Sequence, residues 1–253
     1  RRSTLTLHHP SYEKLAELKL TGTQAALAEQ AERDDMAQMP FMDRLALLLD
    51  REAMEREDRQ LTSRLRRAKL RYPEACLEDL DRRGERALPT GLIEQLTSPG
   101  WIRKHRNVLI SGATGVGKSF LACALAQKAC RDGYSARYER LPTLLAGLSL
   151  ARADGTYAKR FKELSRIRVL ILDDYGLAVL GADERRELLE LLEDRYKRRS
   201  TIVTSQLPVS QWHEAIGDPT FADAILDRLV HNTYRVDLKG ESMRKRLAEE
   251  TSD

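Results

Sequence analysis

The stretch GATGVGKS, Gly112 to Ser119, combines residue types at a spacing that could hold a phosphate group. It matches the pattern G-x-x-x-x-G-K-[ST], follows the apolar run NVLI and precedes the helical pattern SFLACALAQKAC. The glycines let main-chain N–H groups converge on a β-phosphate at the positive end of the helix. Lys118 would neutralise β- and γ-phosphate oxygens, and the hydroxyl of Ser119 would bind Mg²⁺. Against the alternative of an ordinary glycine turn, we predict a nucleotide site formed by Gly112, Ala113, Thr114, Gly115, Val116, Gly117, Lys118, Ser119 and Phe120.

A pair of acids follows a second apolar run, in the stretch RVLILDDYG. The run predicts a buried strand, and its carboxyl end presents Asp173 and Asp174 where open α/β sheets bind their ligands. Asp173 would hold Mg²⁺ through water, and Asp174 would orient and deprotonate the attacking water. An acidic pair after a strand is common, so this prediction depends on the phosphate loop that precedes it. The interval leaves room for one more strand and its helices, as in NTPases that activate water with a carboxylate.

The elements that must position these residues alternate between short apolar runs and helical patterns, which indicates a parallel sheet with crossover helices. The strands are predicted at Asn107–Ser111, Ser135–Glu139, Val169–Leu172, Thr201–Ser205 and Tyr234–Asp237. Helical patterns fill most of the first 72 residues, over 12–17, 23–33 and 40–70, with almost no strand signal. We therefore predict an α/β, three-layer P-loop NTPase (101–253) behind a linker (73–100) and a small all-α N-terminal domain (1–72).

Composition bounds the class of protein. The 253 residues are 42% hydrophobic, 6% aromatic and 32% charged, which is typical of a folded rather than a disordered chain. No apolar run reaches the roughly 18 residues of a membrane span, and no signal-peptide pattern opens the chain, so a cytoplasmic location without a membrane partner is expected. The three cysteines have no CxxC spacing, which argues against a disulfide framework and a zinc site.

The two motifs, together with TIVTSQLPVSQWHEAIGDPTFADAILDRLVHNTYRVDLKGESMRKR, resemble the IstB-like transposition helper ATPases. These are relatives of the DnaC-like helicase loaders within the AAA+ class, and the likeness spans roughly Lys69 to Arg246. The resemblance implies an ATPase that uses ATP and Mg²⁺, oligomerises on duplex DNA and deforms it. It would deliver that DNA as target to the transposase of the same element, and hydrolysis would time disassembly.

The resemblance also implies roles for polar residues beyond the two motifs. The strand TIVTSQ ends where AAA+ proteins keep a sensor of the γ-phosphate, here Ser205 or Gln206. Arg228 occupies the position of the arginine finger that one subunit inserts into the nucleotide site of its neighbour. The alternative for Arg228 is a surface arginine paired with Asp227 or Asp223.

The carboxyl-terminal segment and the catalytic acid raise further expectations. Arg244, in GESMRK, matches the family's C-terminal arginine. Two interpretations stay open for it: a cis sensor of the nucleotide, or part of a solvated basic tail. Many AAA+ proteins carry Glu where this chain has Asp174, one methylene shorter, which makes slow hydrolysis plausible. Little sequence follows Glu250 for the helical lid common in the class. Contacts between subunits would then depend more on the N-terminal helices and on DNA.

Two basic clusters are predicted to bind DNA phosphates without sequence preference, the alternative being a solvated helical face. Lys159, Arg160 and Lys162 lie between the second strand and the acidic strand, where initiator and loader relatives insert a helical element. The stretch RLRRAKLR adds Arg64, Arg66, Arg67, Lys69 and Arg71. A third cluster, YKRRS from Tyr196 to Ser200, is more simply the carboxyl end of a helix matched to its dipole.

Two other functions are compatible with a phosphate loop. A DnaC-like replicative helicase loader would use its N-terminal helices to hold the helicase and its ATP site as a switch. A small-molecule kinase or a GTPase is the third candidate, but the guanine-reading pattern N-K-x-D is absent. Preference for duplex over single-stranded DNA would favour the transposition helper.

Overall fold

The structure is a computed structural model that describes residues 9–80, 90–240, 242 and 243. The chain forms two compact units, Arg1–Ser63 and Arg64–Asp253. The boundary predicted from the sequence lay after Tyr72, and helix α3 (Phe41–Ala68) runs through the division after Ser63. Within the described residues, no helix combines the length and the apolar character that a membrane crossing requires.

The first unit is entirely helical in its described part, as predicted. Helices α1 (Pro10–Glu17) and α2 (Thr21–Ala31), a 3-10 turn η2 (Asp34–Gln38) and the first part of α3 form it. The carboxylate of Glu52 on α3 accepts hydrogen bonds from the amides of Gly22 (2.8 Å) and Thr23 (3.1 Å). Glu52 therefore satisfies free N–H groups at the start of α2 and complements the positive helix end. Gly22 permits this approach, because a Cβ there would lie 2.8 Å from the Cα of Glu52.

The second unit alternates strands and helices along the chain. Its strands are β1 (Asn107–Gly112), β2 (Ala136–Arg140), β3 (Val169–Tyr175), β4 (Ser200–Ser205) and β5 (Thr233–Leu238). Its helices are α4 (Thr90–Thr97), α5 (Gly100–Arg103), α6 (Lys118–Arg131), α7 (Leu141–Ala153), α8 (Tyr157–Arg166), α9 (Ala182–Arg195), η4 (Val209–Gln211), α10 (Trp212–Ile216) and α11 (Pro219–Val230). All five predicted strands are present.

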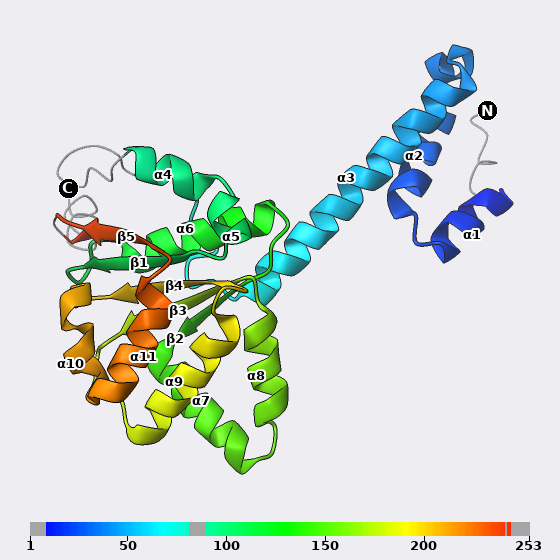
Figure 1. Cartoon of the computed structure of the whole chain (residues 1–253). Coiled ribbons are helices and arrows are strands. Elements are labelled where there is room, and N and C mark those ends of the chain that lie inside the picture. The colour runs from blue at the N-terminus through cyan, green and yellow to red at the C-terminus, as the bar shows by residue number, and fades with distance from the viewer. Residues whose placement is uncertain (1–8, 81–89, 241, 244–253) are drawn as a thin grey trace, which may run out of the picture. The chain divides into compact units, whose positions relative to one another are not determined.

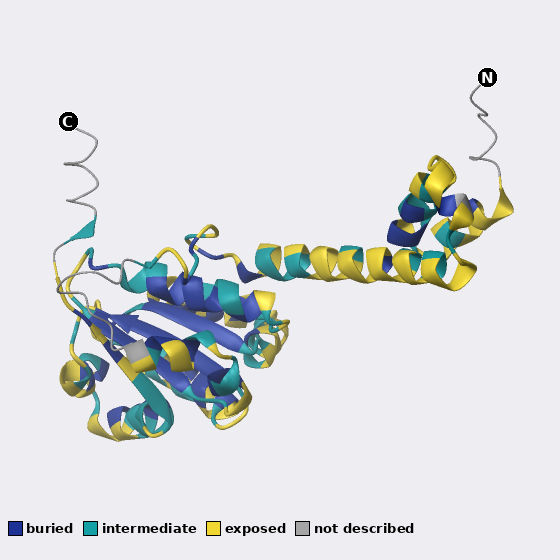
Figure 2. Ribbon diagram, turned by 90° about the horizontal axis from the view of Figure 1, so that it is seen from above, coloured by how far each residue is buried: buried dark blue, intermediate teal, exposed yellow. Residues whose placement is uncertain are grey.

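The strands form one parallel sheet in the order β2-β3-β4-β1-β5, with helices on both faces (Figure 1). Helices α4, α5 and α6 cover one face, and α7, α8, α9 and α11 cover the other. The central strands are therefore buried on both sides, which Figure 2 shows as dark blue arrows, and this explains why Val108, Ile110 and Ile171 stand in continuous apolar runs. The predicted three-layer α/β class is confirmed.

This topology brings the chemical motifs to one edge of the sheet. Parallel strands end at the same edge, so the phosphate loop after β1, the acids that end β3 and the Ser205–Gln206 stretch that ends β4 are neighbours. Strand β4 lies between β1 and β3, and β2 is the additional strand expected between the two motifs. The fold thus creates a polar site from segments far apart in sequence.

Candidate nucleotide-binding site

The phosphate loop joins β1 to α6 with backbone angles that favour glycine. Gly112 and Gly117 have φ of +145° and +98°. At Gly112 a Cβ would also overlap the carbonyl oxygen of Leu238. Gly117 precedes Lys118, the first residue of α6, so the N–H groups of the loop and of the first helical turn lie at the positive helix end.

The Lys118 side chain is folded back over this loop. Its Nζ donates hydrogen bonds to the carbonyl oxygens of Gly112 and Ala113, both at 2.7 Å. Burial lowers the pKa of Lys118 below its ordinary value, and the nearby carboxylates of Asp173 and Asp174 partly offset this. A phosphate oxygen would replace these two carbonyls as the acceptor and would provide the negative charge that they lack.

Asp173 is fully buried at the centre of a hydroxyl cluster. Its two carboxylate oxygens accept from Ser119 Oγ at 2.9 and 3.0 Å, and Thr204 Oγ1 also donates to it. The hydroxyl of Tyr138 donates at 2.5 Å, and the Arg71 guanidinium lies 3.6 Å away. The sequence did not predict that Tyr138 or Arg71 would contact Asp173. Arg71 was instead placed in the basic cluster predicted to bind DNA.

The donor set of this cluster fits Mg²⁺. The hydroxyl of Ser119 and the carboxylate of Asp173 offer oxygen ligands, as a hard cation prefers, beside a loop suited to phosphates. Among the described residues no group of three or more His, Cys, Asp or Glu side chains could hold a metal alone. Mg²⁺ would therefore take most of its ligands from the nucleotide and from water, which is its usual mode of binding.

Asp174 faces the same cavity as a result of an irregularity in β3. Its φ is +65°, and the pairing of β3 with β4 shifts register between Leu172 and Tyr175. In a regular strand consecutive side chains point to opposite faces, so this bend brings both acids to one site. The Asp174 carboxylate pairs with Arg140 Nε at 2.8 Å, and its amide donates to Thr204 Oγ1 at 3.2 Å.

The two candidates for the γ-phosphate sensor have different surroundings. Ser205 is buried, and its hydroxyl donates to the carbonyl oxygen of Tyr175 at 2.8 Å. The side chain of Gln206 lines the cavity and accepts a hydrogen bond from Thr114 Oγ1 in the phosphate loop, at 2.9 Å. The geometry favours Gln206 as the residue that could reach a bound phosphate.

The cavity has a volume of about 640 Å³, within the usual range for small-molecule sites. Besides the phosphate loop, its lining includes Tyr72, Leu80 and Leu238, which offer apolar surface next to the polar cluster. Met243 also lines it and donates its amide to the carbonyl of Gly115 at 2.9 Å. Arg244, the possible cis sensor, lies outside the described residues. The arrangement can hold a phosphorylated ligand with an apolar portion.

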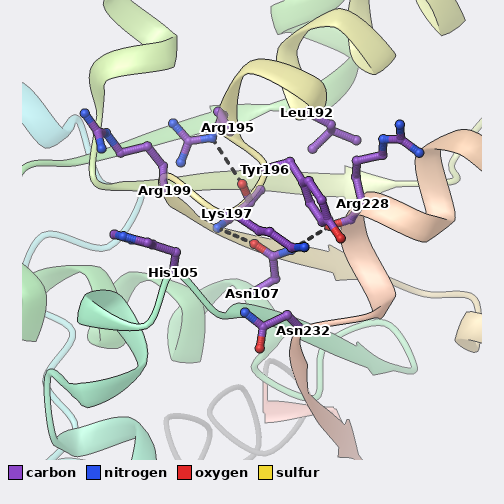
Figure 3. Close-up of a pocket in the computed structure, with 10 residues that line it drawn as sticks. His105, Asn107, Leu192, Arg195, Tyr196, Lys197, Arg199, Arg228 and Asn232 are labelled. Atoms are coloured by element: carbon purple, nitrogen blue, oxygen red, sulfur yellow. Dashed lines mark hydrogen bonds between the residues drawn. The ribbon is translucent and has the colours of Figure 1, made fainter.

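Arg228 lies outside this cavity, beside a small hollow at the opposite edge of the sheet (Figure 3). Its guanidinium pairs with Glu193 at 2.6 Å and with Asp227 at 3.2 Å. The pairing with Asp227 is the alternative expected for a surface arginine. Within this single chain Arg228 does not line the nucleotide cavity, so a role in ATP chemistry requires a neighbouring subunit.

The residues predicted to contact DNA form two clusters, and all but Arg71, which lines the cavity, lie apart from it. Lys159 and Lys162 on α8 are exposed, whereas Arg160 is half-buried and donates to the carbonyl of Gly147 at 3.2 Å. Arg66, Arg67 and Lys69 are exposed. Arg64 donates to the carbonyl of Cys130 at 2.9 Å, so part of its capacity is used within the protein.

The missed residues belong mostly to strand β2 and to the segment after α3. Tyr138 and Arg140 are two positions apart, so they share a face of β2, and β2 pairs with the acidic strand with Arg140 opposite Asp173. A predicted β2–β3 pairing could have found them. Tyr72 and Leu80 lie in a stretch without regular periodicity, and the sequence carries no signal that brings them to the cavity.

Comparison with known proteins shows the family of this chain. Residues 13–251 match the family described as IstB-like ATP binding protein. The chain is 54% identical over 239 residues to a protein named as an insertion sequence ATP-binding protein of Sinorhizobium fredii, covering 94% of this chain and 97% of the relative. It is 49% identical over 197 residues to an ATP-binding protein named for insertion sequence IS1162 of Pseudomonas fluorescens, covering 78% of this chain and 85% of the relative.

Among solved structures, the DnaC helicase loader superposes with a TM-score of 0.56 at 19% identity, covering 67% of this chain and 99% of that chain. This likeness shows the fold, the three-layer α/β fold expected from the sequence. The length and identity of the sequence matches show the family. The chain belongs to the family of IstB-like ATP-binding proteins of insertion sequences.

Proposed function

We propose that this protein hydrolyses ATP while it assembles as a homo-oligomer on duplex DNA, and that it delivers this DNA as target to the transposase of its insertion sequence. Hydrolysis would time the disassembly of the complex, in the cytoplasm. The observation that carries the proposal is the convergence of Lys118, Ser119, Asp173, Asp174 and Gln206 at one edge of the sheet. The names of the relatives, which refer to insertion sequences and to ATP, support the context.

Each of these residues has a chemical role in the proposal. The loop amides and Lys118 bind the phosphates, and Ser119 and Asp173 hold Mg²⁺, which would neutralise charge on the phosphates. Asp174 accepts a proton from the attacking water. To do so it must be released from Arg140, whose Nε lies 2.8 Å from its carboxylate. Gln206 fixes the water or the γ-phosphate from the opposite side.

Arg228 would complete the site of a neighbouring subunit. In this proposal it exchanges Glu193 and Asp227 for the γ-phosphate of the next protomer and stabilises charge in the transition state. Both acids are partly exposed, so their ion pairs with Arg228 are weak enough to be exchanged. The dependence on a second copy links turnover to assembly.

DNA contact is proposed for the exposed basic side chains of the two clusters named above. Arg66, Arg67 and Lys69 lie at the end of the predicted N-terminal domain (1–72), which we assign to contacts with DNA, partner or neighbouring subunit. Lys159 and Lys162 belong to the ATPase domain. Residues 73–100 would form the linker and the entry to the ATPase domain.

A helicase loader remains the alternative function, because a DnaC helicase loader shares the fold. A loader would bind a replicative helicase and would prefer single-stranded DNA. Affinity capture with purified transposase of the same element and with purified replicative helicase separates the two, as does a comparison of duplex with single-stranded DNA. Capture of the helicase alone would contradict our proposal.

A complementation experiment tests the shared site. Lys118→Ala and Arg228→Ala should each have little ATPase activity on duplex DNA, the first because it lacks the phosphate ligand and the second because it lacks the cation in trans. Mixing the two should recover activity, since an intact loop of one protein can meet Arg228 of the other. If both variants join the DNA-bound assembly and the mixture stays inactive, the site between subunits is wrong.

A further inference from the structure

A basic surface of the second unit lies at the amino-terminal edge of its sheet, away from the nucleotide cavity. Strands β3, β4 and β1 are adjacent and parallel, so the loops that enter them lie side by side. We call this surface the basic edge, and it consists of Arg103, Lys104, Arg106, Arg166, Arg168, Lys197, Arg198 and Arg199. Most of these residues belong to no cluster that the sequence singled out for DNA.

Hydrogen bonds hold the three loops against one another. The amide of Ser200 donates to the carbonyl of Arg168 at 3.0 Å, and Arg199 Nε donates to the carbonyl of Arg166 at 3.4 Å. The amide of Thr201 donates to Asn107 Oδ1 at 2.9 Å, which ties β4 to the start of β1. Figure 3 shows the resulting hollow, where His105 and Arg199 point to one side and Arg228 points away on the other.

The charge of the basic edge is largely uncompensated. Within the described residues, Arg198 is the member that pairs with a carboxylate, that of Asp194 at 3.6 Å. Arg106, Arg168 and Lys197 lie over tyrosine rings, contacts that leave their positive charge in place. The cations therefore create a positive field that is free to act on a ligand.

Helix dipoles account for only part of this charge. Helices α8, α9 and α11 and the single turn α5 end at this edge, and each carboxyl end is equivalent to at most about half a negative charge. Together these ends amount to at most about 2 negative charges, against eight cationic side chains. A helix dipole could explain the basic residues of the YKRRS stretch alone. It does not explain the number of cations on the whole basic edge.

Two groups beneath the surface respond to the same field. Burial lowers the pKa of His105, and the positive charges of Arg168 and Arg199 lower it further. Arg195 is fully buried under the loops and bonds main-chain oxygens of Leu164, Ile167 and Ser200. Burial lowers its pKa to about 9, and Arg199 adds to the shift. The positive charge of the basic edge thus lowers the pKa of groups inside the protein.

The chemistry of the surface selects the partner. Stable protein interfaces need an apolar core, and within the described residues the large exposed apolar side chains lie outside these three loops. A dispersed set of cations without apolar residues suits a regular polyanion. We propose that the basic edge binds the phosphate backbone of duplex DNA, as a contact additional to the two clusters predicted from the sequence. This inference rests on the proposed function.

The position of the basic edge is consistent with a continuous DNA path. Arg64, in one of the predicted clusters, bonds the carbonyl of Cys130 at the end of α6. The chain then turns through Tyr134, and the guanidinium of Arg168 lies 5.8 Å from the centre of that ring. The predicted cluster at the end of α3 and the basic edge are therefore neighbours on the second unit.

A salt titration of DNA affinity tests the proposal on the full-length protein. The test variant is Lys104→Gln with Arg198→Gln, both exposed. The control is Arg235→Gln with Arg186→Gln, also exposed and away from the edge. Each pair loses two charges and contains one ion-paired arginine, Arg198 with Asp194 and Arg186 with Asp183, so net charge and pairing are matched. Binding of a fluorescent ATP analogue checks that each variant is folded.

The expected result follows from counterion release. Two lost phosphate contacts reduce the slope of log K against log salt by about 1.8, so the affinity ratio of wild type to test variant should fall about 12-fold from about 50 to about 200 mM salt. The control should keep the wild-type slope. If test and control variants share the wild-type slope, the basic edge is not a DNA contact. If the wild type itself does not bind duplex DNA, the proposed function fails as well.

An acidic protein partner is the competing occupant. The test variant would then keep wild-type affinity and slope for duplex DNA and would lose binding to purified transposase in the absence of DNA. That outcome would overturn the inference and leave the other DNA contacts of the proposed function standing.

Discussion

Replacing Asn107 by alanine should destabilise the second unit strongly, because this one side chain joins three elements. Its Nδ2 donates to the carbonyls of Arg228 (3.0 Å, Figure 3) and Leu229 (3.2 Å), and its Oδ1 accepts from the amide of Thr201 (2.9 Å). The residue is 8% exposed, so water does not readily replace these partners. At about 1 kcal/mol for each hydrogen bond, Asn107→Ala should lower the free energy of unfolding by about 3 kcal/mol.

Tryptophan fluorescence in urea measures this change selectively. The chain has 2 tryptophans, Trp101 and Trp212, and both are buried in the second unit. With a slope of about 2 to 3 kcal/mol per molar urea, the unfolding midpoint should move by about 1 to 1.5 M.

The matched control is Asn232→Ala at the same hollow. The Asn232 side chain is half-buried and makes one long hydrogen bond, to the carbonyl of Lys104 at 3.4 Å. Asn232→Ala should therefore lower the free energy of unfolding by less than about 0.5 kcal/mol. Equal midpoints for Asn107→Ala and the wild type, or equal shifts for both variants, would refute the structural role given to Asn107.

Three further predictions concern other sites. Asp174→Asn should retain ATP affinity, but its rate of ATP hydrolysis on duplex DNA should fall by at least about 100-fold, because Asn tolerates the left-handed backbone but cannot accept the proton. Equilibrium binding measures the affinity, and steady-state hydrolysis measures the rate. An unchanged rate would exclude Asp174 as the base. Tyr138→Phe removes a hydrogen bond to a buried carboxylate and should lower the stability of the second unit by about 2 kcal/mol, measured by the same urea unfolding; a stable variant would show that the bond contributes nothing. Burial raises the pKa of Glu52, but amide hydrogen bonds from Thr23 and Gly22 and the bond from Arg56 outweigh it, so the pKa lies below its ordinary 4.5. A lowered carboxylate pKa stabilises the fold above the unfolded value and loses this effect as pH falls through the folded value. Wild type and Glu52→Gln should therefore differ most in melting temperature above pH 4.5, and the difference should shrink as the pH falls below that value; a constant difference would contradict this.

The fold was predictable because its signals are local. Strand β1, the glycine loop and α6 are contiguous, and the apolar runs that become β3 and β4 are buried on both faces. The strand predicted at Tyr234–Asp237 is observed as Thr233–Leu238. Such elements need only short-range patterns, and the parallel class follows from the helices between them.

Parts of the candidate site depend instead on tertiary pairing. Arg71 reaches Asp173 from the segment after α3, and Tyr138 reaches it because β2 pairs with β3. The sequence has no periodicity that reports either contact. The basic edge could not be predicted from the sequence for a similar reason. Its cations are dispersed over three loops, and only the strand order brings Arg166, Arg199 and Lys104 to one surface.

The bend at Asp174 restricts which acid could serve as the proposed base at that position. Aspartate and asparagine enter the left-handed region more readily than a residue with a longer side chain, so glutamate would favour a straightened strand. Straightening would aim the carboxylate at the far side of the sheet, away from the phosphates. The extra reach of glutamate would thus be lost together with its direction. An attempt to accelerate the proposed ATP hydrolysis with a longer acid would have to redesign residues 172–175 as a whole.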